Sequence, residues 1–391
     1  RINQSYESLR ENISSVMEFD YYGGLLGGAL FAFVLLPFLG LTYTPVLIGS
    51  FNLLVASLIL WYFPDRLTRP RILNAQFIAL FLVSVLAFAV AKPIILYGEQ
   101  HKYKDKIIYQ EQTRYQKIVV TQWKDDYWLF INGSTQFSTY DEERYHEPLV
   151  HPLMGLIKER KDILLLGGGD GLAAREILKY PDLENLTLVD LDPAMTRLAR
   201  QDKVFLGINQ GSLNDPRVRV VNQDAYQFIK NSGDLYDAVI IDLPDPKSVS
   251  LSLLYSLGFY KMVEKHLKPF GSMVTQSTSP LYSPEAFLCI KKTMEAAGFS
   301  TIPYQNSVPS MGQWGWVLGV RQKTMPAQRL KQELLTLEFA DIETRFFNRD
   351  AMISMAHFGK GLFEKEAQIE PNTQFDHNIL KYYRQGNWDV Y

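Results

Sequence analysis

Four aspartates stand where short apolar runs of this sequence end: Asp170, Asp190, Asp224 and Asp245. Each run resembles a buried strand, and the carboxyl ends of parallel strands meet at one edge of a sheet, where ligands bind. An aspartate at such a place also has an ordinary structural use, because it caps the next helix or forms a turn. Four in register make a negatively charged edge, which favours a cationic ligand.

The most informative of these acids is surrounded by glycines. An apolar strand leads into the glycine turn around Asp170, a helical pattern follows, and a second apolar strand ends on Asp190. This order of strand, turn, helix, strand and acid is typical of the first βαβ unit of a nucleotide-binding sheet, in which the acid holds a ribose. The glycines expected to approach the ligand are Gly167, Gly169 and Gly171.

Asp170 places a carboxylate inside this turn. A pyrophosphate would be repelled there, which counts against NAD, and so would the carboxylate of S-adenosylmethionine. Decarboxylated S-adenosylmethionine keeps an amine and lacks that carboxylate, so it would pair well with Asp170. The charge of the turn therefore favours an aminopropyl donor over a methyl donor.

The N-terminal quarter of the chain has a different composition. Residues 21–64 and 72–91 contain no charged residue, and a helix of about 20 apolar residues is enough to cross a bilayer. A buried hairpin of a soluble protein is the disfavoured alternative, and a signal peptide would supply one span instead of three. The three predicted spans are roughly Tyr22–Gly40, Pro45–Phe63 and Leu73–Tyr97.

The charges on the two sides of these spans give conflicting indications of their orientation in the membrane. The loop 65–71 carries Arg66, Arg69 and Arg71, and the positive-inside rule would place it in the cytoplasm. Three lysines follow the third span on the opposite side, at positions 102, 104 and 106. The chain begins with Arg1 and not with methionine, so we expect further segments upstream.

The remaining sequence predicts a small β module and the rest of the sheet. Residues 106–137 are rich in β-branched and aromatic residues, and Asn132-Gly133 is a strong hairpin signal, so we expect three to four antiparallel strands there. A helix is predicted over 140–158, capped by Asp141 or Thr139. Further elements are predicted as strands at 218–221, 236–241 and 272–276, helices at 262–268, 284–297, 330–337 and 378–383, and a last strand pair within 308–320.

The fold class predicted is α/β, a Rossmann-like (methyltransferase-type) doubly wound sheet preceded by a small antiparallel β module and three transmembrane helices. The predicted divisions are a pre-membrane segment 1–20, a transmembrane region 21–99, a β module 106–139, a catalytic domain 140–325 and a C-terminal helical tail 326–391.

Charge and cysteine content exclude several classes of protein. The net charge of −2 argues against a nucleic-acid binder. Cys289 is the single cysteine, so neither an internal disulfide nor a cysteine metal site is available. His146 and His151 are five residues apart with Pro148 between them, which does not suit a zinc helix. We predict no metal and no tightly bound cofactor.

Taken together, several motifs resemble the polyamine aminopropyltransferases, that is, the spermidine synthases, over about residues 107–320. These motifs are Gly167–Gly171, Arg175-Glu176, Tyr145-His146-Glu147, Asp245-Pro246 and Val274-Thr275-Gln276. The three predicted spans, the sequence Asp242–Pro246 and residues 308–316 are similar to the membrane-bound bacterial branch of that family.

The resemblance implies roles for individual residues. Asp245 would be the catalytic base or cation anchor for the acceptor amine. The family's second acceptor-site tyrosine corresponds here to Val308, which leaves the acceptor open. Substrate contacts are implied on the acceptor side for Tyr145 and Asp242, and on the donor side for Gln136, Asp170, Asp190, Asp224 and Ala225. His146 is also expected to bind substrate, without a side assigned to it.

The expected activity is transfer of an aminopropyl group from decarboxylated S-adenosylmethionine to a diamine or polyamine, with putrescine as the first choice. Two alternatives stay open: a methyltransferase built on the same sheet, and a non-catalytic polyamine-binding membrane protein. Because both substrates are made in the cytoplasm, we expect a multi-pass inner (plasma) membrane protein with a cytoplasmic catalytic domain. The oligomeric state is open, with a homodimer among the options.

Overall fold

The computed structural model describes residues 2–63 and 70–388, and the chain divides into two compact units, 1–106 and 107–391. Arg1 and most of the predicted arginine-rich loop, with Arg66 and Arg69, lie outside the described residues. The two units are described separately below.

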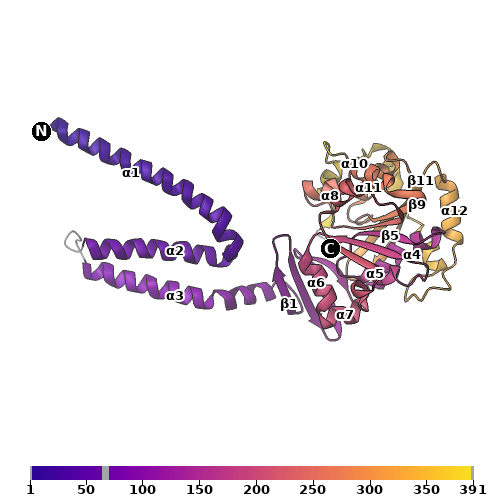
Figure 1. Ribbon diagram of the computed structural model, residues 1–391, viewed down its shortest axis with the longest axis horizontal. Coiled ribbons are helices and arrows are strands. Elements are labelled where there is room, and N and C mark those ends of the chain that lie inside the picture. Colours follow the sequence, from indigo (N-terminus) through magenta and orange to yellow (C-terminus); the bar gives the residue numbers. More distant parts are fainter. Residues whose placement is uncertain (1, 64–69, 389–391) are drawn as a thin grey trace. The chain divides into compact units, whose positions relative to one another are not determined.

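The N-terminal unit is made of long apolar helices (Figure 1). Within the described residues, three segments are long and apolar enough to cross a membrane, as the sequence predicted: Glu11–Gly40, Tyr43–Tyr62 and Arg71–Val90. The helical path is interrupted between the first two segments at Gly40, whose φ of 65° is left-handed. The Thr44 hydroxyl donates to the Gly40 carbonyl at 2.6 Å. The helices are α1 (Ile2–Leu30), the π-helical turn η1 (Phe31–Leu35), α2 (Leu36–Tyr62) and α3 (Pro70–Gln100).

The second unit begins with a four-stranded sheet in the order β1-β2-β3-β4. The pairs β2–β3 and β3–β4 are antiparallel. The predicted hairpin turn is present, with φ of 51° at Asn132 and 82° at Gly133, and positive φ at both positions suits the twist of a tight hairpin. The strands are β1 (Lys106–Gln112), β2 (Lys117–Trp123), β3 (Asp126–Ile131) and β4 (Ser134–Ser138).

The main sheet has seven strands in the order β10-β11-β9-β8-β5-β6-β7. The chain winds outward from β5 through β6 to β7, returns to the other side of β5 as β8, and continues to β9. These five strands are parallel, and β11 and β10 complete the sheet in antiparallel fashion. The strands are β5 (Asp162–Gly167), β6 (Asn185–Asp190), β7 (Val218–Asn222), β8 (Tyr236–Asp242), β9 (Leu267–Gln276), β10 (Phe299–Val308) and β11 (Gly312–Arg321).

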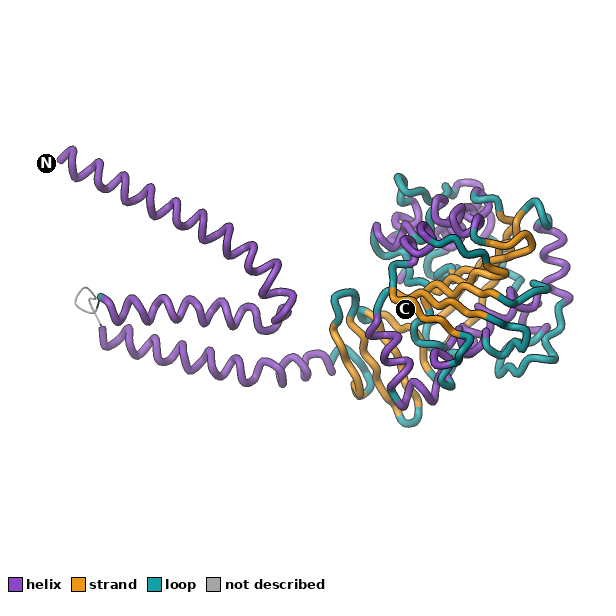
Figure 2. The backbone as a smooth tube through the Cα atoms, in the orientation of Figure 1, coloured by secondary structure: helices purple, strands orange, loops and turns teal. Residues whose placement is uncertain are grey.

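Helices cover both faces of this sheet (Figure 2). Successive residues of β5 belong to two separate apolar cores, with Ile163 and Leu165 in one and Leu164 and Leu166 in the other. This alternation follows from the two-residue period of a strand, and it confirms the predicted doubly wound fold. The helices are α4 (Glu143–Leu156), α5 (Leu172–Ile177), α6 (Pro193–Gln201), α7 (Lys203–Asn209), α8 (Ala225–Asn231), α9 (Val249–Leu253), α10 (Leu257–Lys265), α11 (Pro284–Ala296), α12 (Ala327–Thr336), α13 (Arg349–Met355) and α14 (Asn378–Arg384), with 3-10 turns η3 (Ser212–Asn214) and η4 (Leu362–Gln368).

The start of α4 differs from the prediction, because neither suggested residue caps it. The Asp141 carboxylate accepts bonds from the backbone N–H and hydroxyl of Ser310, at 2.6 and 2.7 Å. The Thr139 hydroxyl donates to Asp126 at 3.0 Å. Both side chains therefore join α4's leading segment to other parts of the unit.

Two other boundaries were predicted wrongly. Helix α10 ends at Lys265 and β9 already begins at Leu267, so there is no helix through residue 268. Strand β10 begins at Phe299, nine residues before the predicted strand pair. A proline inside a run argues against a strand, but Pro303 is tolerated because β10 lies at the edge of the sheet.

Candidate active site

The site lies where the winding of the sheet changes direction, between β5 and β8. Gly167 at the end of β5 pairs in register with Asp242 at the end of β8. A Cβ added to Gly167 would lie 1.9 Å from the Asp242 carbonyl oxygen, so this close approach requires glycine. Ligands of doubly wound sheets bind at this kind of switch point.

Asp190, at the end of β6, is held by two backbone groups. Its Oδ2 accepts from the Gly169 N–H at 3.1 Å and its Oδ1 from the Asp192 N–H at 2.9 Å. Burial raises the pKa of Asp190 to about 6, the two backbone bonds oppose this, and the charge of Asp170 adds to it. The carboxylate is therefore fixed against the glycine turn at the end of β6.

Asp170 lies in the glycine turn, two residues before α5 begins at Leu172. Its Oδ1 accepts from the Leu172 N–H at 2.8 Å, which is an ordinary structural use of an aspartate. Burial raises its pKa, while the positive charge of His146 lowers it. Asp170 therefore has a structural partner as well as the charge that the donor argument requires.

Helix α4 supplies the groups that face Asp242. The Tyr145 hydroxyl donates to Asp242 Oδ1 at 2.7 Å. Burial raises the pKa of Asp242 to about 6; His146 opposes this and Asp170 adds to it. The charge of Asp170 therefore acts on an acid across the switch point, and His146 acts on both acids.

His146 is buried beside Glu142, with its Nδ1 3.0 Å from Glu142 Oε2. Burial alone would lower the pKa of His146, but the hydrogen bond and charge of Glu142 outweigh it, and Asp170 and Asp242 act in the same direction. The pKa of His146 is therefore raised above its usual value. Its hydrogen bond to Glu142 gives it a structural role as well.

Asp245, in the loop after β8, is buried among polar side chains. Its Oδ2 accepts from the Tyr383 hydroxyl at 2.9 Å, and its Oδ1 lies 3.4 Å from Gln276 Nε2. Burial raises the pKa of Asp245, while Lys247 and these two hydrogen bonds lower it. A carboxylate with a raised pKa suits a group that accepts a proton.

Gln276, at the end of β9, organises this loop. Its Nε2 lies 2.6 Å from both the Leu243 carbonyl and the Tyr255 hydroxyl, and its Oε1 accepts from the Trp314 indole N–H at 3.3 Å. Sequence reasoning included Gln276 in a motif without giving it a role, and it missed Tyr255 and Tyr383. For Gln276 the signal was available, because it ends a strand next to β8.

The other predicted site residues are less closely connected. Asp224 is exposed and caps α8, with its Oδ1 accepting from the Gln227 N–H at 2.9 Å, and Ala225 begins that helix as a buried residue. Gln136 on β4 donates to the carbonyls of Ser134 and Thr135 at 3.1 and 3.3 Å. Gly171 has a φ of 88°, and an added Cβ would lie 2.7 Å from the Ser212 hydroxyl.

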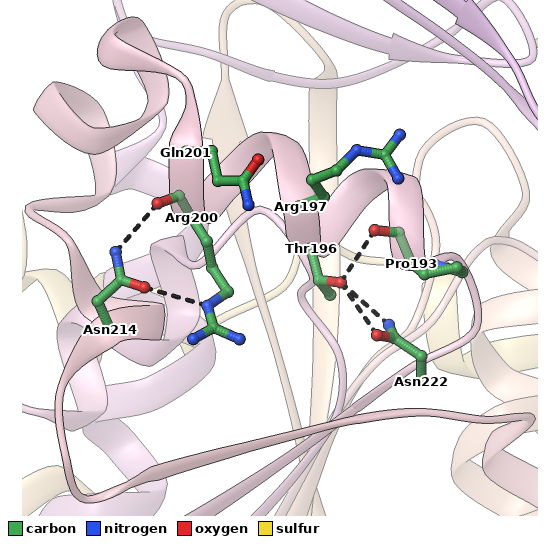
Figure 3. Close-up of a pocket in the computed structure, with 7 residues that line it drawn as sticks. All are labelled: Pro193, Thr196, Arg197, Arg200, Gln201, Asn214 and Asn222. Atoms are coloured by element: carbon green, nitrogen blue, oxygen red, sulfur yellow. Dashed lines mark hydrogen bonds between the residues drawn. The ribbon is translucent and has the colours of Figure 1, made fainter.

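A surface hollow of about 350 Å³ lies beside α6 (Figure 3). Its lining includes none of the acids at the sheet edge. Arg197 forms an ion pair with Glu111 at 2.8 Å, and Arg200 donates to Asn214 at 3.0 Å. We assign no part of the chemistry to this hollow.

Comparison with known proteins gives a consistent result. The family model described as "Spermine/spermidine synthase domain" matches residues 142–332. The polyamine aminopropyltransferase of Oceanobacillus iheyensis is 38% identical over 396 residues, covering 100% of this chain and 75% of that protein. Polyamine aminopropyltransferase 2 of Aquifex aeolicus is 41% identical over 387 residues, covering 98% of this chain and 74% of that protein.

Solved structures are similar in fold. The crystal structure of spermidine synthase from Thermotoga maritima aligns with a TM-score of 0.58 at 23% identity, covering 67% of this chain and 88% of that one. A spermidine synthase in complex with the transition-state analogue AdoDATO aligns with a TM-score of 0.59. The likeness supports the predicted sheet architecture.

Proposed function

Because this chain belongs to the polyamine aminopropyltransferase family, whose reaction is aminopropyl transfer, we propose that its donor is decarboxylated S-adenosylmethionine and its acceptor a diamine such as putrescine. The observation that carries this proposal is the row of acids on both sides of the switch point. Asp170 follows β5 and Asp190 ends β6, whereas Asp242 ends β8 and Asp245 follows it. This order suggests a donor on one side and an acceptor on the other.

On the donor side, Asp190 would accept hydrogen bonds from the ribose hydroxyls. Asp170 would pair with the aminopropyl amine, and Asp224 with Ala225 would bound the adenine. The charge of Asp170 would discriminate against a donor that still carries its carboxylate. Gln136 and the turn glycines Gly167, Gly169 and Gly171 would complete this side.

On the acceptor side, the amine is protonated at neutral pH and must lose a proton before it attacks. Asp245 would take that proton. The nitrogen lone pair then forms a bond to the aminopropyl carbon next to the sulfonium, and the carbon–sulfur bond breaks with its electrons passing to sulfur. The leaving group is neutral methylthioadenosine, so no covalent enzyme intermediate is required.

The remaining contribution of the protein is to position the two substrates in line. Tyr145, held by its bond to Asp242, and the buried His146 would shape the acceptor side. The acids of the site favour an acceptor with two or more ammonium groups, since carboxylates attract each additional positive charge.

We further propose that the three apolar helices cross the inner membrane and hold the catalytic unit in the cytoplasm. Their length and composition support a membrane location. The cytoplasmic side follows from the substrates, both of which are made there. The arginines of the loop 65–71 favour the opposite orientation, but the charge asymmetry is small and this is the weaker argument.

The direct test is to incubate the full chain with decarboxylated S-adenosylmethionine and a panel of diamines, and to identify the products by mass spectrometry. We expect methylthioadenosine together with an amine that has gained one aminopropyl group, most rapidly from putrescine. A methylated product formed from S-adenosylmethionine would instead indicate a methyltransferase. Donor binding without any product would indicate a binding protein.

A further inference from the structure

We propose that Tyr383, on the C-terminal helix α14, is a positioning residue of the acceptor side, and that Asn372 and His377 of the same segment, 372–383, dock it beside the loop that bears Asp245. This inference rests on the proposed role of Asp245 as the base. Neither Tyr383 nor the segment lies in the region 142–332 that matches the family domain, and no local sequence pattern points to them.

The contact between Tyr383 and Asp245 is short and buried. The phenol O–H donates to Asp245 Oδ2 at 2.9 Å, and the two side chains are 6% and 9% exposed. The other oxygen of the carboxylate, Oδ1, makes a longer contact of 3.4 Å to Gln276 Nε2. Tyr383 therefore supplies the better of these two hydrogen bonds, and hydrogen bonds to a charged acceptor are among the stronger ones.

The same segment also makes hydrogen bonds to the two helices that follow Asp245, α9 and α10. The Asn372 side-chain amide donates to the Ser252 carbonyl at 2.8 Å, and the Asn372 backbone carbonyl accepts from the Leu257 N–H at 2.8 Å. His377 Nδ1 lies 2.8 Å from the Ser252 hydroxyl. Three contacts on α9 and the start of α10 thus accompany the bond to Asp245.

These contacts give the segment a place in the geometry of catalysis. Strand β8 leads directly into the loop that bears Asp245, and α9 follows that loop. With the segment docked, Tyr383 holds the loop at Asp245, and Asn372 and His377 hold the following helix α9 at Ser252. A base must lie within hydrogen-bond reach of the proton that it removes, so the orientation of Asp245 depends on this docking.

The electrostatic surroundings of Asp245 make the effect of Tyr383 measurable. Lys247 on the same loop lowers the Asp245 pKa, and the Tyr383 hydroxyl also lowers it. Tyr255 and Tyr145 also lie close enough to interact with the Asp245 carboxylate. Removing the Tyr383 hydroxyl takes away one group that favours the charged base, so the acid limb of the rate profile should move to higher pH.

The test is Tyr383→Phe in the full chain, compared with Tyr382→Phe. Tyr382 is the neighbouring residue on α14, and its hydroxyl accepts from the Glu370 N–H at 3.2 Å, away from Asp245. We expect Tyr383→Phe to lower kcat/KM for the amine by about tenfold, to shift the acid limb of its pH profile upward, and to leave the affinity for the donor unchanged. Tyr382→Phe should behave like the unaltered enzyme in all three measurements.

The outcomes separate this inference from the function on which it rests. Full activity in Asp245→Asn would overturn the assignment of Asp245 as the base. If Asp245→Asn is inactive but Tyr383→Phe keeps the normal kcat/KM and pH profile, the positioning role is wrong while the proposed function stands. Loss of donor binding in Tyr383→Phe, or an equal loss of activity in Tyr382→Phe, would show a general structural role and would also overturn it.

Discussion

The Tyr145 hydroxyl donates a hydrogen bond to Asp242 Oδ1 at 2.7 Å, which joins helix α4 to the end of strand β8. The ring of Tyr145 packs 5.5 Å from that of Trp316 on β11. One side chain therefore fixes an acid of the acceptor side against two separate elements. This rigidity is what a reaction governed by substrate positioning requires.

The first prediction concerns the base. Asp245→Asn keeps the shape of the side chain and removes its ability to accept a proton, so turnover should fall by about 10²- to 10⁴-fold. Donor affinity, measured by calorimetry, should change little because we propose that Asp245 serves the acceptor side. Near-normal turnover would contradict the assignment of the base.

The second prediction concerns pH. Burial raises the pKa values of Asp190 and Asp242 to about 6, so both acids gain protons as the pH falls through that value. Protonated acids bind cations and hydroxyl donors less well, and kcat/KM should therefore decline below pH of about 6. A profile that stays flat down to pH of about 5 would be inconsistent with these pKa values.

The same two acids fix the sign of the stability effect. Their pKa values in the folded chain lie above the ordinary 3.8, so the folded state binds protons more readily than the unfolded chain. Through these groups, lowering the pH from about 7 to about 5 stabilises the fold. The loss of activity should therefore occur without unfolding, which circular dichroism at each pH checks.

The third prediction concerns the C-terminal region. Glu147 is fully buried and accepts three backbone N–H bonds, from Arg345 at 2.7 Å, Phe346 at 2.9 Å and Phe347 at 2.8 Å. Glu147→Ala leaves these donors unpaired and should lower the free energy of unfolding by about 3 kcal/mol. Urea unfolding of the detergent-solubilised chain measures this change.

An exposed acid in the same region provides the control. Glu338 forms an ion pair with Arg349 at 2.7 Å, and both side chains are largely exposed. Glu338→Ala should change the free energy of unfolding by less than about 1 kcal/mol. Similar effects of the two substitutions would mean that the buried carboxylate does not anchor the region.

The fourth prediction concerns membrane orientation. Cys289 is the single cysteine and is buried, so the unaltered chain should not react with a thiol reagent while folded. Lys323→Cys places an exposed thiol in the turn after β11. A membrane-impermeant maleimide should label this variant in inverted vesicles and not in intact cells; labelling in intact cells would place the catalytic unit outside.

The sequence was sufficient for the parts of the site that depend on local order. The glycine turn and Asp190 belong to one βαβ unit, and such a unit determines both the parallel pairing and the edge on which its acids lie. The presence of the other parallel strands was equally readable, because buried strands are short apolar runs.

The remaining features depend on contacts between distant segments. Tyr383 reaches Asp245 across 138 residues of sequence, and nothing in the residues around it distinguishes it from a surface tyrosine of a short helix. Asp224 shows the opposite difficulty, because its position at a strand end is also that of a helix cap. Pro303 concealed β10, since only the edge position of that strand makes the proline acceptable.

The most direct test of the central claim is a comparison of donors. Calorimetry of the full chain with S-adenosylmethionine and with its decarboxylated form measures the selectivity that we attribute to Asp170. We predict that the decarboxylated donor binds at least about tenfold more tightly, and that Asp170→Asn reduces this ratio. Tighter binding of intact S-adenosylmethionine would contradict the account.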